Sequence, residues 1–226
     1  MSDVSRFETR PEYAALAESL RALLERDFDL GRRGRVVVGV AGESGSGKSV
    51  TAASLTRALT AAGVPAGVLH QDDYFVRPPR TNHEHRLRDL GAVGPHEVDL
   101  VRLAEHVTAF RDGRDAVEGP LVDYPGDRFV VQRHDFAGLA ALVVEGTYVL
   151  TLPDLDVRVF LEATHEDTRA RRLARARDAD DPFVDMVLGV EHALIAPQAA
   201  VADVLVDRDF TVRPRAHESL NRGSGQ

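Results

Sequence analysis

The 226-residue chain has no cysteine and no tryptophan, and only one of its 28 basic residues, Lys48, is a lysine. Without cysteine it can form no disulfide, no thiolate nucleophile and no metal site with cysteine ligands. A single lysine excludes a lysine-rich arm, the lysine-containing guanine-recognition motif of GTPases and phosphate loops that need two lysines. With 36 acidic residues the formal net charge is −8, which opposes binding to nucleic acid or anionic membranes through net charge.

Long apolar segments are also missing from the sequence. No stretch reaches the roughly 18 apolar residues of a membrane span, and the N-terminal residues lack the apolar centre of a signal peptide. The length suits one domain, and the hydrophobic share of 43% and the charged share of 28% are ordinary for a soluble globular protein. We therefore expect a cytoplasmic protein built around one main domain.

The order of apolar patterns predicts strands that alternate with helices. The continuous apolar run at 36–40 is typical of a strand buried on both faces of a parallel sheet. Further strands are expected at 66–70, 141–145, 157–161 and 203–206, and helices at 11–30, 48–62, 98–110, 166–177 and 182–195. This alternation predicts an α/β fold with a five-stranded parallel sheet flanked by helices.

Residues 120–134 interrupt the alternation of strands and helices. Two short apolar segments there flank the turn-forming Pro125-Gly126-Asp127, which predicts a small β-hairpin insertion. The expected organisation is an N-terminal accessory helix within 1–34 and a main domain at 35–212. The polar segment 213–226, which ends in Gly-Ser-Gly-Gln, is expected to be a flexible tail.

Residues 42–49 (GESGSGKS) match the phosphate-binding loop pattern GxxxxGK[ST], between a buried strand and a helix. Glycines let backbone amides wrap phosphates, and the helix N-terminus adds a positive dipole. Lys48 is expected to reach the β- and γ-phosphates, and the Ser49 hydroxyl to bind Mg²⁺. Glu43 would repel a phosphate, so we expect its side chain to point outward. The residues expected to bind ATP are Gly42, Ser44, Gly45, Ser46, Gly47, Lys48, Ser49 and Val50.

Carboxylates follow the second expected strand and end the third. Loops like 42–49 also occur in ABC transporter ATPases, but this chain has no LSGGQ signature, and no water-positioning carboxylate follows Glu145. Asp72 and Asp73 come after the strand at 66–70, at the edge where open α/β sheets bind ligands. A carboxylate there can accept the proton of an attacking hydroxyl. The alternative is that both acids lie in a solvated turn.

The segment QDDYF at 71–75 and the apolar strand ending in Glu145-Gly146 resemble the uridine kinase/phosphoribulokinase family of P-loop kinases. Segments 191–197 and 202–206 extend the resemblance over about residues 35–207. Nicotinamide riboside kinases are similar through 71–73, and pantothenate kinases share the general plan. The resemblance implies a P-loop kinase fold in which Asp72 is the catalytic base and Glu145 helps to hold Mg²⁺ through water. An ordinary charge at a strand end is the alternative for Glu145.

The helix expected after Thr164 begins with a capping box, Thr164-x-x-Asp167, and carries several arginines. The resemblance places the kinase lid at about 166–182. Arg169 and Arg172 share a helix face, and in a lid they would neutralise the transferring phosphoryl group. A solvated basic surface is the alternative.

The resemblance places the acceptor lobe, with the hairpin, at about 76–134. Residues 93–99 (VGPHEVD) match the uridine kinase pattern DHPxAxD except that Val93 replaces the first acid, which in that family contacts the ribose hydroxyls. His96 and the neighbouring polar residues could equally be ordinary surface residues. The residues expected near the acceptor are Asp72, Asp73, Phe75, His96, Asp99, Tyr124 and Arg128.

Together these features predict an ATP- and Mg²⁺-dependent kinase that phosphorylates a hydroxyl of a small metabolite. A nucleoside is the first expectation for the acceptor, and nicotinamide riboside, pantothenate and a sugar are the alternatives. A P-loop protein that binds nucleotide in a regulatory role without transferring phosphate is the competing class. No nucleic-acid or membrane partner is expected, and a homo-oligomer is left open.

Overall fold

The computed structural model describes residues 10–28, 30, 34–174 and 181–215, except the side chains of 170–174. Its main sheet has the strand order β2-β5-β1-β6-β7-β8. The first five strands are parallel, as predicted, and β8 adds an antiparallel edge strand. The strands are β1 (Val36–Gly42), β2 (Ala66–His70), β5 (Ala141–Glu145), β6 (Val157–Leu161), β7 (Val204–Val206) and β8 (Val212–Pro214).

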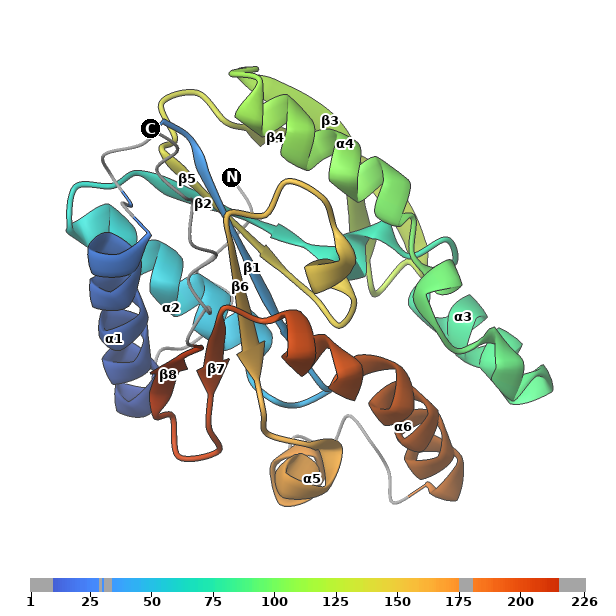
Figure 1. Cartoon of the computed structure of the whole chain (residues 1–226). Coiled ribbons are helices and arrows are strands. Elements are labelled where there is room, and N and C mark those ends of the chain that lie inside the picture. The colour runs from blue at the N-terminus through green and yellow to red at the C-terminus, as the bar shows by residue number, and fades with distance from the viewer. Residues whose placement is uncertain (1–9, 29, 31–33, 175–180, 216–226) are drawn as a thin grey trace, which may run out of the picture.

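Helices cover both faces of this sheet. Figure 1 shows α1 and α2 side by side on one face and α4 on the other, while α5 and α6 lie beyond one end of the strands. The helices are α1 (Pro11–Asp27), α2 (Lys48–Ala61), α3 (Pro79–Arg88), α4 (Leu100–Arg111), α5 (His165–Ala174) and α6 (Pro182–Ile195). Short 3₁₀ helices are η2 (Gln71–Tyr74), η3 (Leu90–Ala92), η4 (Pro95–Glu97), η5 (Val149–Thr151) and η6 (Ala196–Val201).

The central strand β1 explains why the sequence shows an apolar run without alternation. All seven of its residues are buried. Val36, Val38 and Val40 pack into the core beneath α1 and α2, whereas Val37 and Ala41 pack into the core beneath α4. A strand that serves two cores needs apolar side chains on both faces.

The predicted hairpin is present and is longer than the sequence indicated. β3 (Ala116–Asp123) and β4 (Arg128–Asp135) form a separate two-stranded antiparallel sheet. The Asp73 carboxylate in η2 ties the hairpin to the main domain, because its Oδ1 accepts a hydrogen bond from the Val122 amide at 2.9 Å. The β2 end and the hairpin are therefore positioned together.

Helix α3 was not predicted, because its segment is almost entirely polar and begins with the second of two consecutive prolines. The segment expected to be a tail also differs, since Val212–Pro214 pairs with β7, while residues 216–226 lie outside the described residues. Contrary to the sequence prediction, Pro182–Val201 is long and apolar enough to span a membrane by length and composition alone. This segment contains Glu191, whose carboxylate lies 3.2 Å from Arg86, and Ile195, which is fully buried in the core.

Candidate active site

The loop after β1 has the backbone that a phosphate cradle needs. Gly45 and Gly47 have φ angles of 82° and 99°, which favour glycine, and a Cβ on Gly47 would collide with the Tyr13 ring of α1. Lys48 begins α2, and its Nζ donates to the Glu43 carbonyl oxygen at 3.3 Å. The Ser46 hydroxyl is buried without a hydrogen-bond partner among the described residues. These groups fit a phosphate chain at the N-terminus of α2.

The carboxylate of Glu145 ends β5 beside the phosphate loop. It is 3% exposed, and its Oε1 lies 2.7 Å from His70 Nδ1, because the two residues are register partners on neighbouring parallel strands. Burial alone would raise the pKa of Glu145. The hydrogen bond and charge of His70, the charge of Lys48 and a hydrogen bond from Ser49 outweigh burial and lower this pKa. An ionised carboxylate beside a serine hydroxyl is a donor set suited to Mg²⁺.

Asp72 lies in η2, one turn beyond the end of β2. Asp72 is exposed, and its side chain lines an open cavity. Loss of hydration and the Glu145 charge raise the pKa of Asp72, while Lys48, His70 and Arg86 oppose this rise. A carboxylate with a raised pKa is a better proton acceptor than an ordinary aspartate.

One cavity of about 250 Å³ joins the phosphate loop to the acceptor lobe. It begins at Lys48 and Asp72 and extends between α3, the hairpin and α6, so it brings together segments that are far apart in the sequence. Its lining consists of Ser44, Lys48, Asp72, Phe75, Arg77, Pro79, Asn82, Arg86, Tyr124, Phe129, Thr147 and Glu191.

A buried ion-pair network forms the part of this cavity that α3 and α6 line. Arg86 makes two hydrogen bonds to the fully buried Glu97, at 2.7 and 2.8 Å, and its Nη2 lies 3.2 Å from Glu191 Oε1. Asn82 donates to Glu97 at 2.8 Å, and its own buried Oδ1 has no partner among the described residues. Burial raises the pKa of Glu191, and the charges of Arg86 and Lys48 offset part of that rise. The end of the cavity therefore offers hydrogen-bonding groups held rigidly by Glu97.

A model of the Phosphoribulokinase / Uridine kinase family matches residues 37–213 of the chain. The chain belongs to this family of kinases. Its kinase fold agrees with the solved structures it resembles: a putative fructose transport system kinase from Silicibacter sp. TM1040 aligns with a TM-score of 0.59 at 25% identity, covering 84% of this chain and 94% of that one. A possible uridine kinase from Bacillus stearothermophilus aligns with a TM-score of 0.64 at 20% identity, covering 86% and 98%.

Relatives of this kinase include both sugar and nucleoside kinases. A bifunctional α-galactosidase/sucrose kinase of Mediterraneibacter gnavus is 31% identical over 192 residues, which are 79% of this chain but only 20% of that longer protein. A uridine kinase of Leuconostoc citreum is 27% identical over 193 residues, covering 76% of this chain and 86% of that enzyme. Family membership therefore leaves the acceptor open.

The structure brings only some of the predicted acceptor residues to the cavity of this kinase. Asp72, Phe75 and Tyr124 line it. Asp73 does not, because it is buried and its carboxylate accepts a hydrogen bond from the Val122 amide of the hairpin. The remaining three, which also lie outside the lining, are His96 beside Gly94, Asp99 at the N-cap of α4 and Arg128, which pairs with Asp123 at 2.9 Å on the hairpin.

Several cavity residues could not be predicted from local sequence patterns. Asn82 and Arg86 lie on the polar helix α3, and Glu191 lies more than 100 positions later, on α6. The sequence contains one indication of this arrangement. Compared with the uridine kinase pattern DHPxAxD, residues 93–99 have Val93 in place of the first acid and an additional acid at Glu97. The structure shows that this new acid holds Arg86 and does not face the acceptor space.

The structure describes only part of the predicted lid at 166–182. The capping box is confirmed, since Thr164 and Asp167 exchange hydrogen bonds of 2.9 and 3.3 Å at the start of α5. Arg169 is half exposed and lies 3.6 Å from Asp185 of α6. The Arg172 side chain and residues 175–180 lie outside the described residues, so a phosphate-neutralising role for these arginines stays a prediction.

The prediction that Glu43 points outward is wrong. Its side chain is 6% exposed, and its carboxylate accepts hydrogen bonds from the backbone and ring of His165 and contacts the His192 ring. The carboxylate is therefore held by groups of α5 and α6 and is not solvated.

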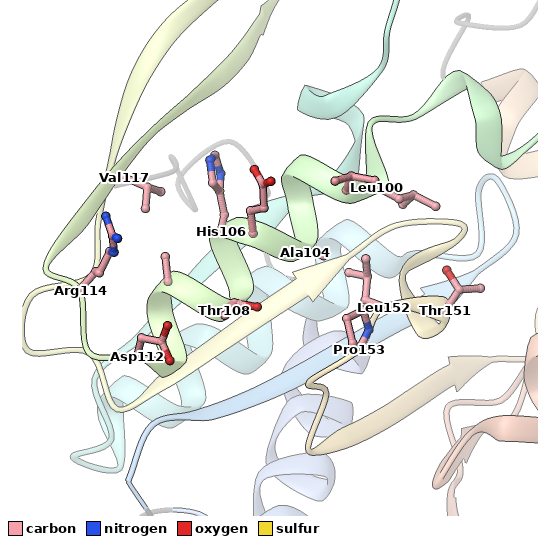
Figure 2. Close-up of a pocket in the computed structure, with 13 residues that line it drawn as sticks. Leu100, Ala104, His106, Thr108, Asp112, Arg114, Val117, Thr151, Leu152 and Pro153 are labelled. Carbon is pink, nitrogen blue, oxygen red and sulfur yellow. The ribbon is translucent and has the colours of Figure 1, made fainter.

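A larger cavity, of about 780 Å³, lies elsewhere in the kinase. Figure 2 shows it between α4 and the segment Thr151–Pro153, with Leu100 and Ala104 on its α4 side. Neither Lys48 nor Asp72 contributes to its lining, which is mainly apolar. The larger cavity therefore lacks the residues expected to react. The smaller cavity, which Lys48 and Asp72 line, is the candidate active site.

Proposed function

We propose that the chain transfers the γ-phosphoryl group of ATP to a hydroxyl of a neutral sugar or sugar-like polyol. The observation that supports this proposal is the single cavity that has Lys48 and Asp72 at one end and Asn82, Arg86 and Glu191 around the rest. A transferring phosphate and an acceptor hydroxyl have to meet within one such space.

The phosphate loop would hold the triphosphate through its backbone amides and Lys48. Ser49 and Glu145 would hold Mg²⁺, as a serine hydroxyl and an ionised carboxylate lie together there. When bound, Mg²⁺ neutralises charge on the phosphate oxygens. His70 keeps Glu145 ionised through the 2.7 Å contact, so this carboxylate remains available near neutral pH.

Asp72 would orient the acceptor hydroxyl and take up its proton. As the acceptor oxygen forms its bond to the γ-phosphorus, the bond from that phosphorus to the bridging oxygen breaks, and ADP leaves with the electron pair. The proton passes to the Asp72 carboxylate, whose raised pKa favours uptake. Lys48 faces the same space and stabilises the negative charge of the phosphates.

The chemistry of the cavity favours a polyol as acceptor. Arg86 and Asn82 are held by the buried Glu97, so both present fixed hydrogen-bonding groups to the lining. Glu191 adds a carboxylate that can accept hydrogen bonds from hydroxyls. Val93, which is 4% exposed, takes the place of the acid that contacts ribose in uridine kinases. The likeness to part of a bifunctional α-galactosidase/sucrose kinase and to a putative fructose transport system kinase supports the same choice.

A nucleoside is the second candidate, and aromatic residues in the lining favour it. Phe75, Tyr124 and Phe129 line the cavity, and a planar base could stack on such rings. The uridine kinases among the relatives support this candidate. We include three further points in this proposal. The protein is cytoplasmic, it uses ATP and not another phosphate donor, and it acts without a nucleic-acid or membrane partner.

An acceptor-dependent ADP-release assay tests the proposal. The panel contains hexoses, sucrose, pentoses and their alditols, uridine, cytidine, nicotinamide riboside and pantothenate, with ATP and Mg²⁺ present. We expect release with one or more sugars and, with Asp72→Asn, a rate lower by about 10²–10⁴-fold, while that variant still binds ATP. Release with a nucleoside alone would replace the first candidate by the second. No release with any acceptor would favour the nucleotide-binding regulatory protein.

A further inference from the structure

We propose that Glu43, His165 and His192 form a binding site for a divalent transition-metal ion of the Zn²⁺ type, separate from the Mg²⁺ site of the kinase. The three residues come from three segments: the phosphate loop, the first turn of α5 and the last turn of α6. One potential ligand atom from each residue lies within 4.8 Å of those of the other two.

The donor atoms already converge on the Glu43 carboxylate. Its Oε1 lies 2.6 Å from His192 Nδ1, and its Oε2 lies 2.8 Å from His165 Nδ1. The two imidazole rings meet edge to face, with centroids 5.6 Å apart and an angle of 61° between their planes. Small movements of the two rings would place both nitrogens and one carboxylate oxygen at the roughly 2.0–2.2 Å bond lengths of zinc.

The donor set selects the kind of ion. Two imidazole nitrogens and one carboxylate oxygen are a known ligand set for zinc that leaves a fourth position for water. Mg²⁺ prefers oxygen donors in an octahedral arrangement, so it should prefer Ser49 and Glu145, where the oxygens are. The two sites therefore differ in chemistry as well as in position.

Two of the three side chains are largely buried and one is accessible to solvent. The Glu43 and His165 side chains are 6% and 16% exposed, whereas the His192 side chain is 45% exposed. The backbone amide of His165 also donates to Glu43 Oε2 at 2.7 Å, which orients the carboxylate independently of the rings. An ion could enter from solvent beside His192 and find two ligands already in place.

A bound ion would link the phosphate loop to α5, the helix of the predicted lid, and to α6. Glu43 directly follows Gly42 of the cradle, and Glu191, which lines the acceptor cavity, directly precedes His192. The ion would thus fix elements from both ends of the active site relative to one another and should raise the thermal stability of the protein.

The test uses the full chain, purified without a polyhistidine tag, freed of metal by chelation and kept without nucleotide. Zn²⁺ is titrated against a chromophoric chelator, and thermal unfolding is followed with and without Zn²⁺. We expect one equivalent of Zn²⁺ to bind and to raise the melting temperature. His192→Ala, at a half-exposed position that should tolerate the change, should weaken binding at least tenfold and abolish the rise. His165→Ala should do the same.

Two control variants separate this site from the other histidines. His70→Ala removes the other histidine–carboxylate pair near the active site, and His83→Ala removes an exposed histidine on α3. Both should keep the wild-type Zn²⁺ affinity. Absence of stoichiometric binding, equal binding by His192→Ala, or loss of binding in His70→Ala would each overturn the proposal. In that case the three residues are only a hydrogen-bonded connection between the phosphate loop and the lid helix.

Discussion

Protonation of one buried histidine should make this kinase unstable in mild acid. His134 of β4 is 4% exposed, and its Nε2 has no hydrogen-bond partner among the described residues. Burial, together with repulsion from the nearby His106 of α4, lowers the pKa of His134 to about 4 from an ordinary value of 6.5. The His106 ring centroid lies 6.1 Å away, and burial lowers its pKa as well.

The sign and the size of the effect follow from proton linkage. Between pH 6.5 and about 4 the unfolded chain binds a proton at this residue and the folded chain does not, so the free energy of unfolding falls as the pH falls. At about 1.36 kcal/mol for each unit of pKa, the full shift corresponds to about 3 kcal/mol. Between pH 7.5 and pH 5 the same relation gives a loss of about 2 kcal/mol.

Replacement of the histidine isolates this contribution. Urea unfolding of the wild type and of His134→Leu, followed by circular dichroism at pH 7.5 and pH 5, gives the loss for each protein. The variant should lose about 2 kcal/mol less than the wild type, because the carboxylates and the histidines that do not contact residue 134 contribute equally to both. His83→Ala, at an exposed position, should behave as the wild type. An equal loss in wild type and His134→Leu would refute the reasoning.

Three further predictions concern the active site and its support. Asp72→Asn should lower kcat by about 10²–10⁴-fold, the range for loss of a general base, with ATP binding retained in a fluorescent-nucleotide displacement assay; a normal kcat would remove Asp72 from the proton transfer. Glu191→Gln should raise the acceptor KM more than the ATP KM, and an unchanged acceptor KM would exclude contact with the acceptor. Asp73→Ala should destabilise the fold by about 1–3 kcal/mol in urea unfolding, because the Val122 amide loses its partner. The adjacent Asp72→Ala is its control and should cost less.

The parallel sheet and the phosphate loop could be predicted because both have local signatures. β1 is apolar at every position since it is buried on both faces, and the loop glycines must adopt left-handed backbone conformations. Strand β8 has three residues and no apolar alternation, so no pattern in the sequence indicates that it pairs with β7.

The acceptor end of the site depends on tertiary contacts that no local pattern contains. Asp72 and Asp73 are adjacent and identical, yet one faces the cavity and the other holds the hairpin, because successive side chains of η2 point in different directions. The buried orientation of Glu43 depends on His165 and His192, which follow it by 122 and 149 positions, so no pattern near the phosphate loop predicts it.

The placement of Lys48 gives this protein a built-in spectroscopic probe. Its Nζ, which lies 3.3 Å from the Glu43 carbonyl oxygen, belongs to the sole lysine in the sequence. Protein produced with isotope-labelled lysine would carry the label at one side chain only, so every lysine signal in its NMR spectrum would arise from the phosphate loop. The response of the phosphate loop to added nucleotide could then be followed without resonance assignment.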